Sequence, residues 1–157
     1  MQLVPIYHFK FEDDFIEDNV RCIPMVVRFK LDAAGIKLKL NEWCKFDVTQ
    51  RNKLAVMECS TVFEKGFYRN YLYKLVVDVT GFEPTNLLIN ENPSWADLQN
   101  IDTSLLAKAK EHDWTISLAQ WRSLSDLQRF ALLKLYRPGH ENKNFPKAMK
   151  EFGLVEN

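Results

Sequence analysis

One stretch of this 157-residue chain occurs twice, and the second copy begins 78 residues after the first. Residues 40–54 and 118–132 share five residue types at equivalent positions, namely Leu40/Leu118, Trp43/Trp121, Gln50/Gln128, Arg51/Arg129 and Leu54/Leu132. Chance would supply only about one or two identities over such a window. The repetition therefore indicates a duplicated helical unit, which the fold must accommodate twice.

Both copies carry the spacing of capped helices, with a side-chain oxygen followed three residues later by Gln. These pairs are Asp47/Gln50 and Ser125/Gln128, and a third pair, Ser117/Gln120, introduces the short Trp-bearing turn of the second copy. We expect each Trp ring to hold its short turn against the longer capped helix. Each unit is predicted to run helix, extended connector, short Trp helix and capped helix, over about 23–58 and 102–136.

The first helix of the first unit has clear start and stop signals. Pro24 suits a first helical turn and Gly35 suits a left-handed stop, so we predict a helix over about 23–34. Residues 36–41 alternate apolar and polar side chains, and we favour an extended connector there over a short strand.

A second long helix is predicted between the two copies, over residues 62–79. Apolar side chains recur there every four residues, at Phe67, Tyr71, Leu75 and Val79. Gly81 ends this helix, and a Pro- and Asn-rich link follows, which we interpret as a surface connection within one fold. The sequence thus predicts an all-α protein, with a single compact helical domain over residues 1–157 and about seven or eight helices.

The charge balance excludes a broad class of partner. The chain has 21 Lys and Arg against 21 Asp and Glu, so it offers no broad positive field to nucleic acid or to an anionic bilayer. No secretory signal is recognisable, and no apolar run approaches the roughly 18 residues of a spanning helix. We expect a soluble cytoplasmic protein with no membrane or nucleic-acid partner. The three cysteines, Cys22, Cys44 and Cys59, are expected to be free buried thiols.

Two blocks of the chain resemble a known family. The first block is residues 22–43, and the second comprises residues 128–135 with Arg137, His140-Glu141-Asn142, Asn144-Phe145 and Glu151-Phe152. In order and spacing they are similar to the nitrate reductase associated protein family, from about Phe9 to Leu154. The resemblance implies a small cyanobacterial-type protein, encoded near nitrate reductase and molybdopterin synthesis genes, with a role in nitrate assimilation. It brings no established catalytic residue, so none is assigned.

The polar loop between Arg137 and Asn144 is the best candidate for a small-molecule site. His140 beside Glu141 could exchange a proton near neutral pH, and Asn142 adds a further polar group. The structural alternative is that the polar side chains of this loop hydrogen-bond helix-end carbonyls and hold the last helix in place. We favour that structural role.

Two arginines are candidates for an anion site. Arg28 and Arg137 could each bind nitrate, a carboxylate or a pterin phosphate through two parallel hydrogen bonds, although local salt bridges are the simpler interpretation. Arg51 and Arg129 are equivalent in the repeat, so we expect them to make the same structural contact twice. The sequence has no phosphate-binding loop, no His-Glu-x-x-His and no paired-cysteine motif. We therefore expect no cofactor, no metal site and no catalytic residue.

Two functions follow from these observations. The first is a non-enzymatic accessory protein that binds nitrate reductase or a protein that assembles its molybdenum cofactor. The second is an anion or pterin binder, or an enzyme, that uses the loop from Arg137 to Asn144. A large exposed patch of Phe or Tyr on the helix over 63–79 would favour the first. The sequence does not predict an oligomeric state.

Overall fold

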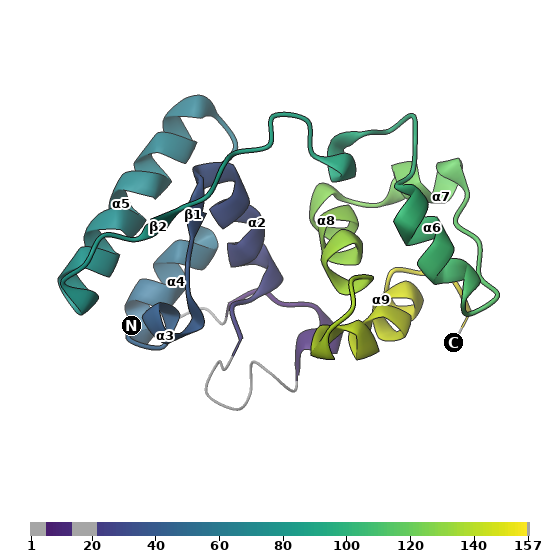
Figure 1. The fold of residues 1–157 in the computed structure, drawn as a ribbon, viewed down its shortest axis with the longest axis horizontal. Helices are drawn as coiled ribbons and strands as arrows, with labels where there is room; N and C mark the ends of the chain where they lie inside the picture. Colours follow the sequence, from purple (N-terminus) through teal and green to yellow (C-terminus); the bar gives the residue numbers. More distant parts are fainter. Residues whose placement is uncertain (1–5, 14–21, 157) are drawn as a thin grey trace. The chain divides into compact units, whose positions relative to one another are not determined.

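Helices account for most of the residues that the computed structural model describes, which are residues 6–13 and 22–156. These residues form eight α-helices, three 3-10 helices and one pair of two-residue strands (Figure 1), which confirms the all-α prediction. The elements are η1 Lys10–Glu12, α2 Met25–Ala34, β1 Ile36–Lys37, α3 Leu40–Trp43, α4 Val48–Val56, α5 Val62–Thr80, β2 Thr85–Asn86, η2 Ser94–Ala96, α6 Thr103–Lys110, α7 Leu118–Ser123, α8 Asp126–Leu135, η3 His140–Asn144 and α9 Phe145–Glu151.

The chain divides into two compact units, residues 1–90 and residues 91–157. The division falls inside the Pro- and Asn-rich link, and each unit contains one of the two predicted repeats. A division into compact units does not test whether they form one domain, so the single domain over residues 1–157 stays a prediction.

Unit 1 is built around α2, which packs against α4 and α5. Its fully buried side chains include Val27, Leu54 and Leu72, one from each of these helices. Tyr68 of α5 is also fully buried, and its hydroxyl donates to the carbonyl oxygen of Leu54 at 2.8 Å. This bond satisfies the polar end of a large core side chain and joins α5 to α4.

The connector predicted over residues 36–41 is wrong for its first two residues. Ile36 and Lys37 form strand β1, which pairs antiparallel with β2, with Ile36 opposite Asn86 and Lys37 opposite Thr85. Arg69 of α5 supports this ladder, because its Nη1 donates to the carbonyl oxygen of Gly35 at 2.8 Å. The partner strand comes from the polar link and has no apolar alternation, so no sequence pattern indicated the pairing.

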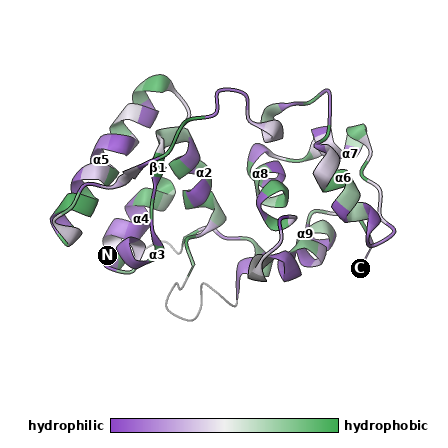
Figure 2. Cartoon of the chain, viewed as in Figure 1, coloured by the Kyte–Doolittle hydropathy of each residue, from purple (hydrophilic) through white to green (hydrophobic). Residues whose placement is uncertain are grey.

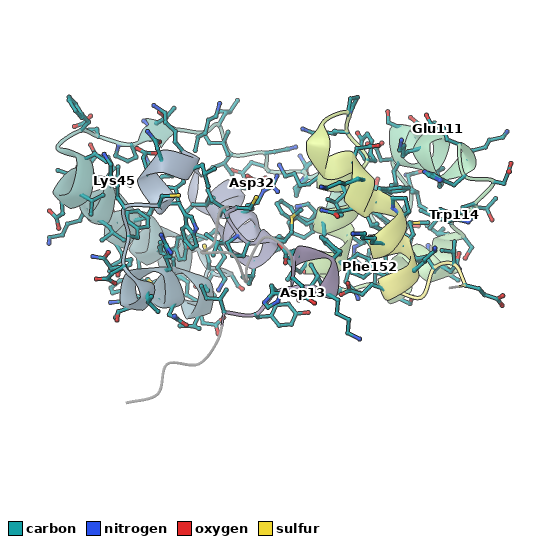
Figure 3. All side chains as sticks on the ribbon, turned by 90° about the horizontal axis from the view of Figure 1, so that it is seen from below. Asp13, Asp32, Lys45, Glu111, Trp114 and Phe152 are labelled. Atoms are coloured by element: carbon teal, nitrogen blue, oxygen red, sulfur yellow. The ribbon has the colours of Figure 1, made fainter. Side chains whose placement is uncertain are left out.

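Unit 2 is built around α8, which packs against η2, η3 and α9. Phe130 and Leu132 of α8 are buried together with Phe145 and Met149 of α9. Trp114, in the connection after α6, stacks on His112 with the ring centroids 4.7 Å apart, and Figure 3 labels it. Aromatic and aliphatic side chains therefore supply the core of this smaller unit.

The helix starts predicted from the capping pairs are confirmed. Asp47 Oδ1 accepts from the Gln50 N–H at 2.8 Å, and Gln50 Oε1 accepts from the Asp47 N–H at 2.9 Å. The same reciprocal bonds begin α8 and α7, in the pairs Ser125/Gln128 and Ser117/Gln120. Local side-chain chemistry thus determines where these helices begin.

Each repeat has a left-handed residue after its first helix, and the two residues lie 78 positions apart. Gly35 follows α2 with φ of 76°, and Asp113 follows α6 with φ of 60°. At Gly35 a Cβ atom would lie 3.0 Å from Cγ1 of Ile89 and 3.2 Å from the carbonyl oxygen of Leu87, so a side chain there would crowd its neighbours as well as strain the backbone. Asp is one of the few other residues that adopt this region readily, which suits it to position 113 in the turn after α6.

Each repeat holds its buried Trp with an Arg from the following capped helix. Arg51 Nε donates to the carbonyl oxygen of Trp43 at 3.3 Å, and its guanidinium lies 5.6 Å from the ring centroid of Trp43. Arg129 Nη1 donates to the carbonyl oxygen of Trp121 at 3.4 Å, and its guanidinium lies 5.9 Å from that ring centroid. The offset of 78 residues therefore relates side-chain contacts as well as residue types.

The two Trp side chains differ in one hydrogen bond. Trp121 Nε1 donates to the carbonyl oxygen of Asp97 at 2.8 Å, whereas Trp43 Nε1 has no acceptor among the described residues. Both Trp side chains are fully buried. The indole N–H of Trp43 is thus a buried donor without a described partner, which is an unfavourable arrangement.

One cysteine departs from the predicted environment. None of the three cysteines forms a disulfide; Cys59 is buried and Cys22 is partly buried, but Cys44 is exposed. Cys44 lies at the C-terminal cap of α3, one residue past the buried Trp43, and its side chain leaves the core there.

Glu12 connects η1 to the start of α2. Its carboxylate accepts from the Phe9 N–H at 2.9 Å and from the Met25 N–H at 2.8 Å. Burial raises the pKa of the Glu12 carboxyl above its ordinary value, while the two N–H groups and the nearby His8 and Arg28 oppose the shift.

The raised pKa of Glu12 predicts a pH dependence of stability. The folded state binds this proton more tightly than the unfolded chain, so the contribution of Glu12 is greatest below the ordinary pKa of 4.5 and falls as the pH rises through the folded value. We expect the difference in unfolding free energy between the wild type and Glu12→Gln to decrease above pH 4.5. Urea denaturation at a series of pH values measures it, and a difference that grew with pH would contradict the assignment.

Candidate functional site

Helix α5 has two neighbouring rows of apolar side chains, and one of them is buried more completely than the other. The sequence pattern favoured the row Phe67, Tyr71, Leu75 and Val79, but the fully buried side chains belong to Tyr68, Leu72 and Val76, with Leu75 nearly buried beside them. Of the row in the sequence pattern, Leu75 is buried, Tyr71 and Val79 are partly buried, and Phe67 is exposed.

Phe63 and Phe67 form an exposed aromatic pair near the start of α5. Phe63 is 79% exposed and Phe67 is 59% exposed. Their rings lie one helical turn apart and stack, with centroids 6.3 Å apart and an interplanar angle of 26°. Hydrophobic colour marks the first turn of α5 in Figure 2, where Val62 is exposed as well.

The aromatic pair borders an open hollow of about 260 Å³, lined by Met57, Glu58, Phe63, Glu64 and Phe67. We call these five residues the Phe63–Phe67 surface. Met57 is the C-terminal cap of α4, and Thr61 caps the start of α5 by accepting from the Glu64 N–H at 3.1 Å. The turn between the two helices thus places an aliphatic side chain beside two aromatic rings.

The charged side chains of the hollow are both acidic. Glu64 accepts hydrogen bonds from the N–H groups of Thr61 and Ser60, at 2.9 and 3.1 Å, and these bonds lower the pKa of its carboxyl. Glu58 is exposed and attracts the ammonium of Lys30, whose Nζ donates to the carbonyl oxygen of Ala55 at 2.6 Å. At neutral pH the hollow therefore combines apolar walls with two carboxylates.

Asn142 of the polar loop has the structural role that we favoured from the sequence, which is to hydrogen-bond carbonyl groups at a helix end. The Asn142 side-chain amide donates to the carbonyl oxygens of Leu135, Tyr136 and Arg137, at 3.3, 3.0 and 3.2 Å. It therefore satisfies carbonyl groups left free where α8 ends.

The other candidates of the loop lie in different surroundings. Asn144 is buried before α9, whereas Arg137 is exposed just past α8. His140 and Glu141 belong to η3, but their side chains lie outside what the structure describes. The acid and base chemistry predicted for them stays a prediction.

Arg28 lies in α2, in unit 1, whereas the other five candidates lie in unit 2. Its side chain is partly buried and its charge opposes the raised pKa of Glu12. The structure thus gives Arg28 an interaction with an acidic group of its own unit, and its proposed anion site stays a prediction.

Neither a metal cluster nor a spanning helix is present in the part of the chain that the structure describes. No group of three His, Cys, Asp or Glu side chains gathers there in a way that could hold a metal ion. None of the helices described is both long enough and apolar enough to cross a membrane.

Met57, Glu58 and Glu64 were not predicted from the sequence as members of a surface site. Two signals were present: a Phe pair at the spacing i, i+4, and Gly66 inside a helix, where glycine has an energetic cost. Neither signal states which row of α5 is buried, so the surface could not be identified without the packing of α5.

Residues 8–152 match the family model described as conserved nitrate reductase-associated protein. The chain belongs to this family. The match confirms the resemblance found in the sequence, and it covers the Phe63–Phe67 surface and the polar loop alike, so it does not choose between them. No curated protein and no solved structure matches the chain.

Proposed function

We propose that this member of the nitrate reductase-associated family is a non-enzymatic accessory protein of nitrate assimilation. It binds nitrate reductase, or a protein that loads the molybdenum cofactor, by direct contact through the Phe63–Phe67 surface. The exposure of two stacked Phe rings carries the proposal, because large aromatic side chains exposed together beside a hollow are typical of protein interfaces. The sequence predicts a cytoplasmic protein, and the proposal keeps that setting.

The energetics support a specific interface at this surface. Burying a Phe side chain contributes about 1.5–3 kcal/mol, so the two rings could contribute about 3–6 kcal/mol to a complex. A few aromatic anchors commonly supply most of the binding free energy of an interface, and near-neutral contacts surround them. The Asn142 contacts in unit 2 give the polar loop a structural task, so no observation favours the loop as a second function.

The double variant Phe63→Ser/Phe67→Ser tests the contact. Both rings are exposed, so we expect the free energy of unfolding to change by less than about 0.5 kcal/mol for each substitution. We expect the variant to lose its capture of nitrate reductase or cofactor-loading proteins in pull-downs from nitrate-grown cells. Leu88→Ser is the matched control, because Leu88 is 95% exposed but lies outside the surface. Equal capture by the wild type and the double variant would exclude this surface as the contact.

The proposed role in nitrate assimilation is tested separately by deleting the gene that encodes the chain. We expect the deletion strain to grow poorly on nitrate and normally on ammonium, and we expect the wild-type chain to restore growth on nitrate. Restoration by Phe63→Ser/Phe67→Ser would count against the proposed contact, and normal growth of the deletion strain on nitrate would count against the proposed pathway.

A further inference from the structure

We propose that the Phe63–Phe67 surface binds an amphipathic α-helix of the partner protein, with Lys or Arg beside the apolar stripe of that helix. This inference rests on the proposed function and adds the chemistry of the partner to it. It depends on three observations: the shape of the exposed face of α5, an unexplained glycine in that face, and the acidic lining of the hollow.

The exposed face of α5 has the shape of a helix-packing surface. Phe63, Gly66, Phe67 and Asn70 are exposed, and their spacing of three and four residues places them on one face. Within this face, Gly66 carries no side chain, so the backbone of α5 is open to close approach by a ridge of side chains from another helix. The backbone groups of α5 are bonded within the helix, so this face offers no edge for an added strand.

Gly66 has no explanation among the residues that the structure describes. A Cβ atom at this position would have no neighbour within 4 Å among them, and the residue does not adopt a positive φ. Glycine inside a helix is less favourable than alanine, because it loses more backbone freedom on folding. A glycine on the same exposed helix face as two Phe residues is explained if a partner backbone approaches it closely, which a Cβ atom would prevent.

The negative charge of the hollow favours a partner helix that carries positive charge. Glu58 and Glu64 are the charged residues of its lining, and Lys65, although adjacent in sequence, does not belong to the lining. An apolar stripe flanked by Lys or Arg would meet both the rings and the carboxylates. A second copy of this chain, docked through the same surface, would bring four carboxylates together, and like charges at an interface oppose association.

A photo-reactive side chain identifies the occupant directly. Benzoylphenylalanine in place of Phe67 is irradiated in nitrate-grown cells, and the cross-linked segment is identified by mass spectrometry. The same side chain in place of Leu88 gives the background. The expected product at position 67 is a helical segment of another protein with Lys or Arg beside its apolar residues. A second copy of this chain, a non-helical or non-basic segment, or no product above background would each overturn the inference.

Substitutions in the full chain test the glycine and the charges separately. Gly66→Ala is expected to raise the melting temperature by about 2–4 °C, because the helix gains a better former and no atom is crowded. The same variant is expected to reduce the cross-link yield at position 67 about tenfold, through a clash with the partner helix. Glu58→Gln/Glu64→Gln is expected to reduce the yield about three- to tenfold, since Gln keeps the cap of α5 but not the charge.

The outcomes separate this inference from the proposed function. An unchanged cross-link yield in Gly66→Ala, together with the expected rise in melting temperature, would overturn close helix packing. A nitrate reductase segment without Lys or Arg would overturn the helix chemistry and leave the proposed function in place. A basic helix from a protein unconnected with nitrate would support the chemistry of the surface and contradict the proposed function.

Discussion

Replacing Arg129 with Met is expected to lower the unfolding free energy of unit 2 by about 3–5 kcal/mol. The Arg129 side chain is nearly fully buried and donates from Nε to the carbonyl oxygen of Trp95 at 2.7 Å. Its Nη1 donates to the carbonyl oxygen of Leu124, and its Nη2 pairs with the carboxylate of Asp126. Met fills similar space but donates no hydrogen bond, so carbonyl groups in and near the core lose their partner.

Arg51→Met is the matched control for this substitution. Arg51 is equivalent in the repeat but only partly buried, and it donates to two carbonyl oxygens, those of Trp43 and Cys44. We expect its replacement to cost about 1–2 kcal/mol, since water can reach part of the vacated site. Urea denaturation followed by Trp fluorescence suits the comparison, because Trp43 reports on unit 1 and the other three Trp residues report on unit 2. Equal costs at the two positions would contradict the difference in burial.

The substitutions Trp121→Phe and Trp43→Phe are expected to differ by about 2 kcal/mol in unfolding free energy. Both remove part of a fully buried ring and leave a similar cavity. Trp121→Phe also removes the 2.8 Å hydrogen bond to the carbonyl oxygen of Asp97, so we expect it to cost about 2–3 kcal/mol. Trp43→Phe removes a buried N–H that has no described acceptor, so the relief offsets much of the cavity term and the net change is within about 1 kcal/mol.

The Trp comparison is measured by thermal and urea denaturation of the two single variants. Circular dichroism at 222 nm is the better signal here, because the substitutions change the fluorescence itself. A large loss of stability in Trp43→Phe would show that its indole N–H has an acceptor in the folded chain.

The elements that sequence analysis located correctly are those determined by contacts between near neighbours. The helix starts at Asp47, Ser117 and Ser125 depend on a bond between residues three apart, and the stop at Gly35 depends on one backbone conformation. Such features are present in the sequence because the partner is always a few residues away.

The elements that sequence analysis missed depend on partners far along the chain. Strand β1 exists because residues 85–86 of the link return to it. The orientation of α5 was also not predictable from its own residues, because its two adjacent rows are both apolar and either could have been buried. The repeat shows the same limit, since Trp43 and Trp121 occupy equivalent positions in the sequence but differ in the hydrogen bonding of the indole N–H.

The sequence by itself determined the helical class, the capped helix starts, the two equivalent Trp and Arg pairs, and the family to which the chain belongs. Only the tertiary structure decided which aromatic side chains are exposed. Periodicity gives the spacing of an apolar row but not its direction, and the packing of Tyr68 and Leu72 into unit 1 turned Phe63 and Phe67 outward. Phe is a residue type that usually lies in a core, so a surface site made of Phe side chains can be recognised only when the structure shows that other side chains form the core.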